Sequence, residues 1–293
     1  MVNRKDTLWE QFLQPIVGIF IDGKQLRQLY ESIDWQRECD RLSTPDLVYP
    51  DYYKSQNFHG IEGGYLNGGA ATSYDPITQY ALPPNETWVR QELIDRIQGT
   101  PRRILDLGCG TGSTTLLLKK AFPEAEVIGL DLSPYMLVMA ERKAEAAGVD
   151  IQWRHGKAEE TGLPEASFDL VTASLLFHET PTAVAKSILR ESFRLLKGGG
   201  QVLILDGNQR TLRQVNWLTE VFEEPYIKAY ATDSVDAWMG SAGFEAVQTQ
   251  DVWLLNQVTQ GMKPLPVDEQ VYQRTQRRTI DDFGSEGIPA PAY

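Results

Sequence analysis

Short runs of apolar residues alternate along the middle of the chain with longer amphipathic segments. The apolar runs span residues 104–107, 125–131, 151–159 with its turn, 167–174 and 201–206. Helix-like segments separate most of them, at 113–120, 134–148 and 190–197. Two more runs, 244–249 and 252–258, follow each other directly and predict an antiparallel closing pair. The pattern therefore predicts an α/β fold with a mostly parallel sheet.

A glycine-rich loop directly follows the first apolar run. Asp106 ends the run, and glycines stand at every second position after it, at Gly108, Gly110 and Gly112. Glycine is required where the backbone takes a positive φ or where a ligand approaches it closely. A dinucleotide-binding loop, G-x-G-x-x-G, would need a glycine in place of Ser113, and no Lys-Ser/Thr pair follows as in a Walker loop. The loop is therefore a ligand-binding turn of another class, or an ordinary strand–helix turn.

A second acidic residue, Asp131, ends the next apolar run. An acid at this strand end can accept hydrogen bonds from both ribose hydroxyls of a nucleotide, whereas a solvated carboxylate is the alternative. Ser133 is a good helix N-cap and Pro134 a good first helical residue, and Gly148 is typical of a helix end. These residues predict a helix from 134 to 148.

Together these features resemble the motifs of class I methyltransferases that use S-adenosyl-L-methionine (SAM). The pattern D-x-G-x-G-x-G, the acid at 131, the run S-F-D-L-V-T and the later K-G-G-G occur in the family's order. The resemblance covers residues 85–258 and is most similar to the group that acts on ubiquinone, menaquinone and related small acceptors. It implies a Rossmann-like, doubly wound sheet with an antiparallel closing hairpin, and SAM as the cofactor.

The resemblance also implies which residues contact SAM. In this family the glycine loop lies against the methionine end, with Asp106 near the amino group, and Asp131 holds the ribose. Lys157 stands where the family often has an aspartate that accepts the adenine amino group, and lysine is only a donor. This contact is therefore expected to shift to the Ala158 backbone or to Glu159. The full set expected to bind SAM is Asp106, Gly108, Cys109, Gly110, Gly112, Asp131, Leu132, Met136, Ala158, Glu159 and Ser174.

His178 is the candidate catalytic residue. It lies just after the fourth predicted strand, at the edge where open α/β sheets bind ligands. Imidazole ionises near neutral pH, so His178 can act as a general base, with a histidine at the edge of the core as the alternative. Glu179 beside it can orient a partner or carry charge, and Asp206 can face the acceptor or cap the next helix. Thr182 rules out the zinc motif H-E-x-x-H.

Residues 1–84 form an N-terminal extension to the predicted domain. An apolar stripe predicts a helix over 24–37. Residues 45–84 are rich in aromatics and glycines, include His59, and have no periodicity. By resemblance, such an extension covers the SAM pocket, so we expect it to act as a lid and as a wall of the acceptor site. The alternative is a structural wrap packed on the core. Residues 259–293 are expected to form an extended tail.

Composition limits the possible partners and the location. The formal net charge of −12 disfavours nucleic acid, whose binding needs Lys and Arg to neutralise phosphates. The only cysteines are Cys39 and Cys109, and no Cys/His spacing predicts a metal site, which fits a reducing compartment. The apolar patch at 15–21 is too short for a signal core, and no run is long enough to span a membrane. The expected location is the cytoplasm.

The sequence therefore predicts a methyltransferase that acts on a small, apolar or aromatic acceptor. A protein side-chain methyltransferase is one alternative, although the N-P-P-Y loop typical of amide and adenine targets is replaced by S-L-L-F at 174–177. A non-catalytic module that only binds SAM is another alternative. An NAD-dependent oxidoreductase is excluded by the glycine spacing. The sequence does not identify the acceptor or the oligomeric state.

Overall fold

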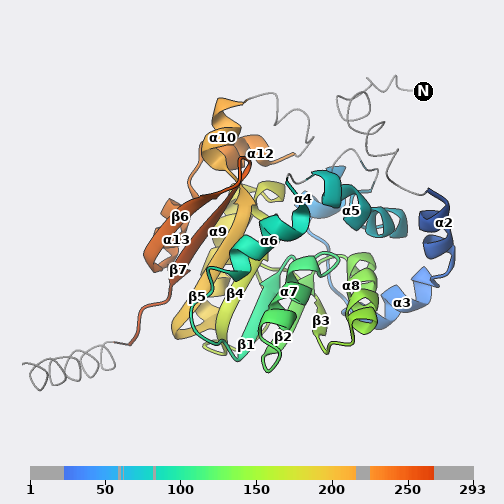
Figure 1. Cartoon of the computed structure of the whole chain (residues 1–293), viewed down its shortest axis with the longest axis horizontal. Helices are drawn as coiled ribbons and strands as arrows, with labels where there is room; N and C mark the ends of the chain where they lie inside the picture. The colour runs from blue at the N-terminus through green and yellow to red at the C-terminus, as the bar shows by residue number, and fades with distance from the viewer. Residues whose placement is uncertain (1–22, 59–60, 62, 82–83, 216–224, 267–293) are drawn as a thin grey trace, which may run out of the picture.

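A mixed β-sheet with helices on both faces forms the centre of the protein (Figure 1). The computed structural model describes residues 23–58, 61, 63–81, 84–215 and 225–266. The sheet has the order β3-β2-β1-β4-β5-β7-β6. Its strands are β1 (Arg103–Leu107), β2 (Glu126–Asp131), β3 (Gln152–His155), β4 (Phe168–Ser174), β5 (Leu196–Gly207), β6 (Glu245–Val252) and β7 (Asn256–Met262). The first five are parallel and β7 is antiparallel to both neighbours. The predicted fold class is confirmed.

Alternating side chains along each strand fill two cores, one on each face of the sheet. Ile104 packs with the helices on one face, and the next residue, Leu105, packs with those on the other. The first face is covered by α6 (Glu86–Ile94), α7 (Ser113–Ala121) and α8 (Pro134–Ala147). The second is covered by α9 (Thr182–Leu195), α10 (Gln209–Gln214), α12 (Ile227–Thr232) and α13 (Val235–Ala242). This is the doubly wound arrangement that the sequence predicts.

Helix α8 begins and ends at the residues that the sequence indicates. The Ser133 hydroxyl accepts a hydrogen bond from the backbone N–H of Met136, 3.2 Å away, which caps the first turn. Pro134 is the first helical residue, and Gly148 ends the helix in the left-handed region at φ 65°. The helix start is thereby fixed beside the end of β2.

The strand order brings three chain segments to one edge of the sheet. Strand β1 pairs with β2 on one side and with β4 on the other, and Leu107 lies opposite both Leu130 and Ala173. The ends of these three parallel strands are therefore level. Open α/β sheets bind ligands at such a point, where the strand order reverses. The glycine loop, Asp131 and Ser174 all follow or end these strands.

The N-terminal extension contains more helix than the sequence predicts. Its described helices are α2 (Gly23–Glu31), α3 (Trp35–Leu42), α4 (Asp51–Lys54) and α5 (Gly68–Ala81). The single helix expected over 24–37 is wrong, because Asp34 accepts a hydrogen bond from the backbone N–H of Arg37 and starts a new helix. The expectation of a non-periodic segment over 45–84 is also wrong. Helix α5 forms there despite Pro76, since Ala70 and Ala71 pack in a core with α8.

The second half of the domain differs from the prediction at its element boundaries. Strand β5 already begins at Leu196, so the glycines that were expected to form a turn belong to the strand. The backbone N–H of Gly199 donates to the Lys263 carbonyl oxygen at 2.8 Å. Strand β7 ends at Met262 rather than at 258. Residues 216–224, between α10 and α12, lie outside the described part of the chain, as does His59.

Candidate functional site

The glycine loop makes a tight turn from β1 into α7. Gly108 and Gly112 have φ values of 62° and 77°, in the left-handed region that favours glycine. A Cβ atom on Gly108 would lie 2.7 Å from the side chain of Leu176. The backbone N–H of Cys109 donates to the carbonyl oxygen of Leu130 at 3.0 Å. The loop is therefore held closely between the ends of β2 and β4, with its backbone facing the sheet edge.

Asp131 connects the end of β2 to this loop. Its carboxylate accepts one hydrogen bond from the backbone N–H of Gly110 and another from that of Ser133, both at 2.8 Å. Burial raises the pKa of Asp131 to about 6, although the two N–H donors act in the opposite direction. The acid is thus held in place by the backbone before any ligand binds.

Asp106 is buried and binds two hydroxyl groups inside the domain. Its two oxygens accept hydrogen bonds from the hydroxyls of Thr115 in α7 and Thr172 in β4, at 2.6 and 2.7 Å. Burial raises its pKa, and these two hydrogen bonds lower it in part. Asp106 therefore connects α7 to the sheet beneath the loop. Its predicted contact with the amino group of SAM is not visible in this arrangement and stays a prediction.

A cavity opens at the sheet edge above the loop and the ends of β2 and β4. It encloses about 680 Å³ of space between atoms, part of which is open to solvent. Eight of the residues predicted to bind SAM line it: Gly108, Gly110, Asp131, Leu132, Met136, Ala158, Glu159 and Ser174. The other three, Asp106, Cys109 and Gly112, are not among its lining residues, and neither is the candidate catalytic residue His178. The structure thus brings most of the predicted set together around one space.

The N-terminal extension supplies an aromatic wall to this cavity. We use that name for its five lining side chains, Tyr52, Tyr53, Phe58, Tyr65 and Tyr74. The rings of Phe58 and Tyr65 stack with centroids 5.2 Å apart, and Tyr74 meets Tyr65 edge-on at 5.9 Å. The sequence indicated an aromatic segment over the pocket, but which rings would line it depends on the fold of the extension.

One carboxylate oxygen in the cavity has no hydrogen-bond partner. Glu159 accepts a hydrogen bond from the Tyr52 hydroxyl at Oε1, 2.8 Å away. Its Oε2 is buried and has no partner among the described residues. A buried acceptor without a hydrogen-bond donor lowers the stability of the folded protein, and a bound ligand can supply the donor. Lys157, which occupies the position that the family usually gives to an acid, instead lies 3.7 Å from the exposed Glu160.

His178 faces the sheet. It lies in the short helix η3 (Phe177–Glu179), and its Nδ1 is 2.6 Å from Oδ1 of Asp206 at the end of β5. The same carboxylate accepts the backbone N–H groups of Phe177 and Gly207, at 2.8 and 2.7 Å. Asp206 is thus a partner of His178 rather than a helix cap, which is provided by Asn208.

Glu179 is the neighbour of His178 that does line the cavity. The hydroxyl of Tyr65, in the aromatic wall, donates to Oε1 of Glu179 at 2.6 Å. From the sequence, Glu179 was expected only to orient a partner or to carry charge, and no role was expected for Tyr65. The two residues are 114 positions apart, so no local pattern could have connected them.

The fold agrees with comparisons to known proteins. A family model described as a methyltransferase domain matches residues 104–200. This match covers β1, β2, β3, β4 and the start of β5, the parallel part of the sheet. The cofactor that this domain implies is SAM.

Curated relatives of the methyltransferase domain have one name in common. The demethylmenaquinone methyltransferase of Thermus thermophilus is 38% identical over 119 residues, which cover 41% of this chain and 53% of that protein. The enzyme of the same name from Bacillus licheniformis is 34% identical over 158 residues, which cover 53% of this chain and 65% of that protein. The chain spans about half the length of the first curated relatives that it matches.

Solved structures share the fold of the methyltransferase domain. A SAM-dependent methyltransferase from Aquifex aeolicus has a TM-score of 0.52 and 18% identity, covering 67% of this chain and 98% of that one. A protein from Nostoc punctiforme has a TM-score of 0.55 and 18% identity, covering 81% and 69%. At such identities the likeness concerns the fold alone.

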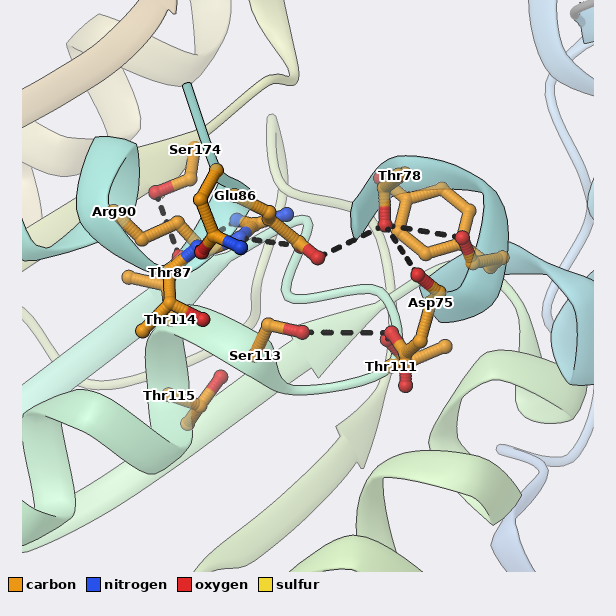
Figure 2. Close-up of polar contacts among 12 residues, drawn as sticks. Asp75, Thr78, Glu86, Thr87, Arg90, Thr111, Ser113, Thr114, Thr115 and Ser174 are labelled. Carbon is orange, nitrogen blue, oxygen red and sulfur yellow. Dashed lines mark hydrogen bonds and ion pairs between the residues drawn. The ribbon is translucent and has the colours of Figure 1, made fainter. Parts of the chain in front are cut away.

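A polar chain runs from the extension through the methyltransferase domain to the cavity, and Figure 2 shows its members. The Thr78 hydroxyl in α5 donates to Glu86 at 3.0 Å, and Glu86 forms a buried ion pair with Arg90, 2.7 Å away. Arg90 also donates to the Thr114 hydroxyl at 2.8 Å, which in turn donates to Ser174 at 3.0 Å. Helix α5 is thus linked to a cavity residue at the end of β4.

A second contact joins α5 to the glycine loop itself (Figure 2). Asp75 accepts hydrogen bonds from the hydroxyls of Thr111 and Ser113. Lys143 of α8 lies 2.7 Å from Asp75 and also donates to both hydroxyls. The extension therefore holds the loop at Thr111 and Ser113, whereas Asp131 holds it at Gly110.

His155, at the end of β3, fixes the other end of the extension. Its Nδ1 accepts the backbone N–H of Thr44 at 2.9 Å, and its Nε2 lies 2.9 Å from the Leu132 carbonyl oxygen. Burial lowers the pKa of this imidazole, in part offset by the hydrogen bond to Leu132. The contacts give His155 a structural role.

The described residues offer neither a metal-ligand cluster nor a membrane-spanning helix. No group of three or more His, Cys, Asp and Glu side chains there could hold a metal ion. Within the same part of the chain, none of the helices has both the length and the apolar character needed to cross a membrane.

Proposed function

We propose that this chain transfers the methyl group of SAM to a small, apolar or aromatic acceptor. The observation that carries the proposal is the cavity between the glycine loop and the aromatic wall. One side offers the backbone and carboxylate groups that a nucleoside-containing cofactor requires. The other side offers aromatic rings, which favour a flat apolar ligand.

The residues present in the cavity fit SAM. Glu159 Oε2, buried without a partner among the described residues, would accept the adenine amino group in place of the missing family aspartate. Asp131 would accept the ribose hydroxyls, since a carboxylate can receive more than the two backbone N–H groups that it already binds. Gly108, Gly110 and Ser174 would face the methionine end.

When bound, SAM supplies a methyl carbon that its sulfonium already activates for in-line displacement. The work of the protein is then to align the acceptor and to exclude water. The loop and Asp131 would fix the cofactor side, and the aromatic wall would fix the acceptor side. Tyr53 and Tyr74 are half-buried. Desolvation of their hydroxyls raises the pKa of both well above the usual value, so these rings stay neutral.

The acceptor class that we favour is a hydroxylated aromatic ring of the quinol type. The relatives named above are demethylmenaquinone methyltransferases, and the aromatic wall suits a ring of that kind. A protein side chain is less favoured, because the five aromatic residues of the extension already line the space that it would enter. A module that only binds SAM would have no use for an acceptor wall.

The proposal is tested in two steps with purified protein. Calorimetry should detect binding of SAM and of its product S-adenosyl-L-homocysteine (SAH), and absence of binding would refute the proposal. Under reducing conditions, methyl-labelled SAM should then transfer label to 1,4-naphthohydroquinone, a soluble ring of the favoured class. Transfer only to protein fractions would favour the protein methyltransferase, and SAM binding without transfer to either would favour the binding module.

A further inference from the structure

We propose that Glu179 is the catalytic residue that receives the proton lost by the acceptor, with Tyr65 orienting its carboxylate. This inference rests on the proposed function, because it concerns the acceptor end of the same cavity. It gives His178, the base expected from the sequence, a supporting position behind Glu179 rather than contact with the acceptor.

The first argument is the position of Glu179 among the carboxylates of the cavity. The described lining residues include three of them, Asp131, Glu159 and Glu179. Asp131 binds the loop backbone at the end of β2, and Glu159 lies beyond β3, where the adenine is expected. Glu179 follows β4, on the methionine side, and faces Tyr65 of the aromatic wall. It is therefore the carboxylate at the end of the cavity where the methyl group and the acceptor would meet.

The second argument is how firmly Tyr65 holds this carboxylate. Its hydroxyl donates to Glu179 at 2.6 Å, within the range of charge-assisted hydrogen bonds. The backbone of Tyr65 is itself fixed, since its carbonyl oxygen accepts the hydroxyl of Ser133 at 2.7 Å. The donor is thus anchored at the start of α8, next to Asp131. A base held in this way is oriented before the acceptor enters.

The third argument is the position of His178 behind Glu179. Oε1 of Glu179 lies 3.9 Å from Nε2 of His178, and each side chain is 13% exposed. Asp206 accepts two backbone N–H groups and lies 2.6 Å from Nδ1 of His178. This contact fixes the ring with Nε2 on the side of Glu179. His178 and Asp206 are accordingly positioning residues.

The surrounding charges define the pH dependence that this arrangement should have. Tyr53, Tyr74 and Asp131 lie close enough for the charge of Glu179 to contribute to their raised pKa values, after the larger effect of burial. From the other sides, Tyr65 donates a hydrogen bond and His178 presents Nε2. The tyrosine hydroxyls stay neutral, so they act as hydrogen-bond donors and do not compete with Glu179 for the proton.

The reaction balances with this single base. The acceptor's electron pair forms a bond to the methyl carbon, and the carbon–sulfur bond breaks with its electron pair returning to sulfur. SAM becomes neutral SAH, and the acceptor gains a methyl group and loses one proton. That proton binds the Glu179 carboxylate and is released to solvent after the product leaves, so the base is regenerated after each turnover.

The test compares single-turnover methyl transfer to 1,4-naphthohydroquinone in the full chain and in three variants. Glu179→Gln should lower the rate about a hundredfold or more, while SAH affinity changes less than about threefold. Tyr65→Phe should retain part of the rate and shift the midpoint of the pH–rate profile upward, because the carboxylate loses a donor that favours its ionised form. Glu145→Gln, an exposed carboxylate in α8, is the matched control and should behave as the unchanged chain.

Several results would overturn the inference. A Glu179→Gln rate within about threefold of the unchanged chain would exclude Glu179 as the base. If that variant does not fold, Tyr65→Phe decides, and an unmoved pH midpoint would overturn the inference. If the unchanged chain binds SAM but does not methylate the probe, this result refutes the proposed acceptor class and does not test the role of Glu179. Binding of 1-naphthol to the SAH complex then tests Glu179, whose change to Ala should weaken binding about tenfold, whereas equal binding would refute the role.

Discussion

Lys143 in α8 and Asp75 in α5 form an ion pair of 2.7 Å that joins the N-terminal extension to the methyltransferase domain. Both residues also contact Thr111 and Ser113, on either side of the last glycine of the loop. The pair therefore does more than connect two helices. It positions the loop that would bind the cofactor, at residues next to the one that Asp131 holds.

Asp75→Asn should weaken SAH binding a few-fold while changing the stability little. The ion pair is partly exposed, with side chains 28% and 30% accessible, so its contribution to the free energy of unfolding is at most about 1 kcal/mol. The loop hydroxyls, however, lose a charged acceptor. Calorimetry with SAH measures the effect, and Asp51→Asn, in the exposed pair with Lys54, is the control. Equal affinity in both variants would show that Asp75 does not position the loop.

Glu159→Ala should weaken SAM binding by about 1.5–3 kcal/mol, because hydrogen bonds to charged groups contribute that much. The variant removes the buried Oε2 that would accept the adenine amino group. Glu160→Ala, in the next residue and largely exposed, should leave the affinity unchanged. Tyr52→Phe distinguishes the roles of the two carboxylate oxygens of Glu159. It removes the hydrogen bond to Oε1 and leaves Oε2 in place. If both glutamate variants bind SAM equally well, the adenine contact lies elsewhere.

Asp131 should make the free energy of unfolding fall as pH rises from 3.8 to about 6. Burial raises the pKa of this acid, so the folded protein holds the proton more tightly than the unfolded chain does. The stabilisation is fully present below this window and is lost above it, and a shift of two pKa units corresponds to on the order of 3 kcal/mol. Asp131→Asn does not titrate and is the reference. The difference in Tm between the two proteins should decrease across the window, and a constant difference would contradict the shift.

Arg90→Met should destabilise the fold by about 3–5 kcal/mol, because it leaves Glu86 buried without a counter-ion. Arg90 and Glu86 are 6% and 10% exposed, and Arg90 also donates to Thr114. The double variant Arg90→Met with Glu86→Met removes both charges and should recover part of the loss. Urea unfolding of the two single variants and the double variant measures the coupling. Additive losses would show that the pair contributes no specific interaction.

The sequence alone could locate the site residues that stand within or directly after a predicted strand or helix start. Gly108 and Asp131 follow predicted strands directly, and a parallel sheet necessarily brings the ends of neighbouring strands together. The start of α8 is likewise encoded by two consecutive residues, Ser133 and Pro134. Eight of the predicted SAM contacts therefore line one cavity, although contact with SAM itself stays a prediction.

The residues that sequence could not locate depend on contacts between distant segments. Asp206 meets His178 because β5 pairs with β4, and the pairing turns the imidazole toward the sheet. Tyr65 meets Glu179 because the extension folds back over the edge of the sheet. Helix α5 has glycines at its start and Pro76 inside, so its intrinsic helix propensity is low, and packing against α8 stabilises it.

The aromatic wall has a consequence for how the enzyme could change its acceptor. All five of its side chains lie within residues 52–74, one continuous stretch that precedes the first strand, whereas the predicted cofactor contacts come from the sheet. Selection or engineering can therefore change the residues of the acceptor wall while the residues expected to bind the cofactor stay the same. Residues 52–74 can be exchanged between homologous chains while Asp75 and Thr78 are kept, because these two residues connect α5 to the rest of the domain. Such exchanges would change the acceptor site and leave the cofactor site unchanged.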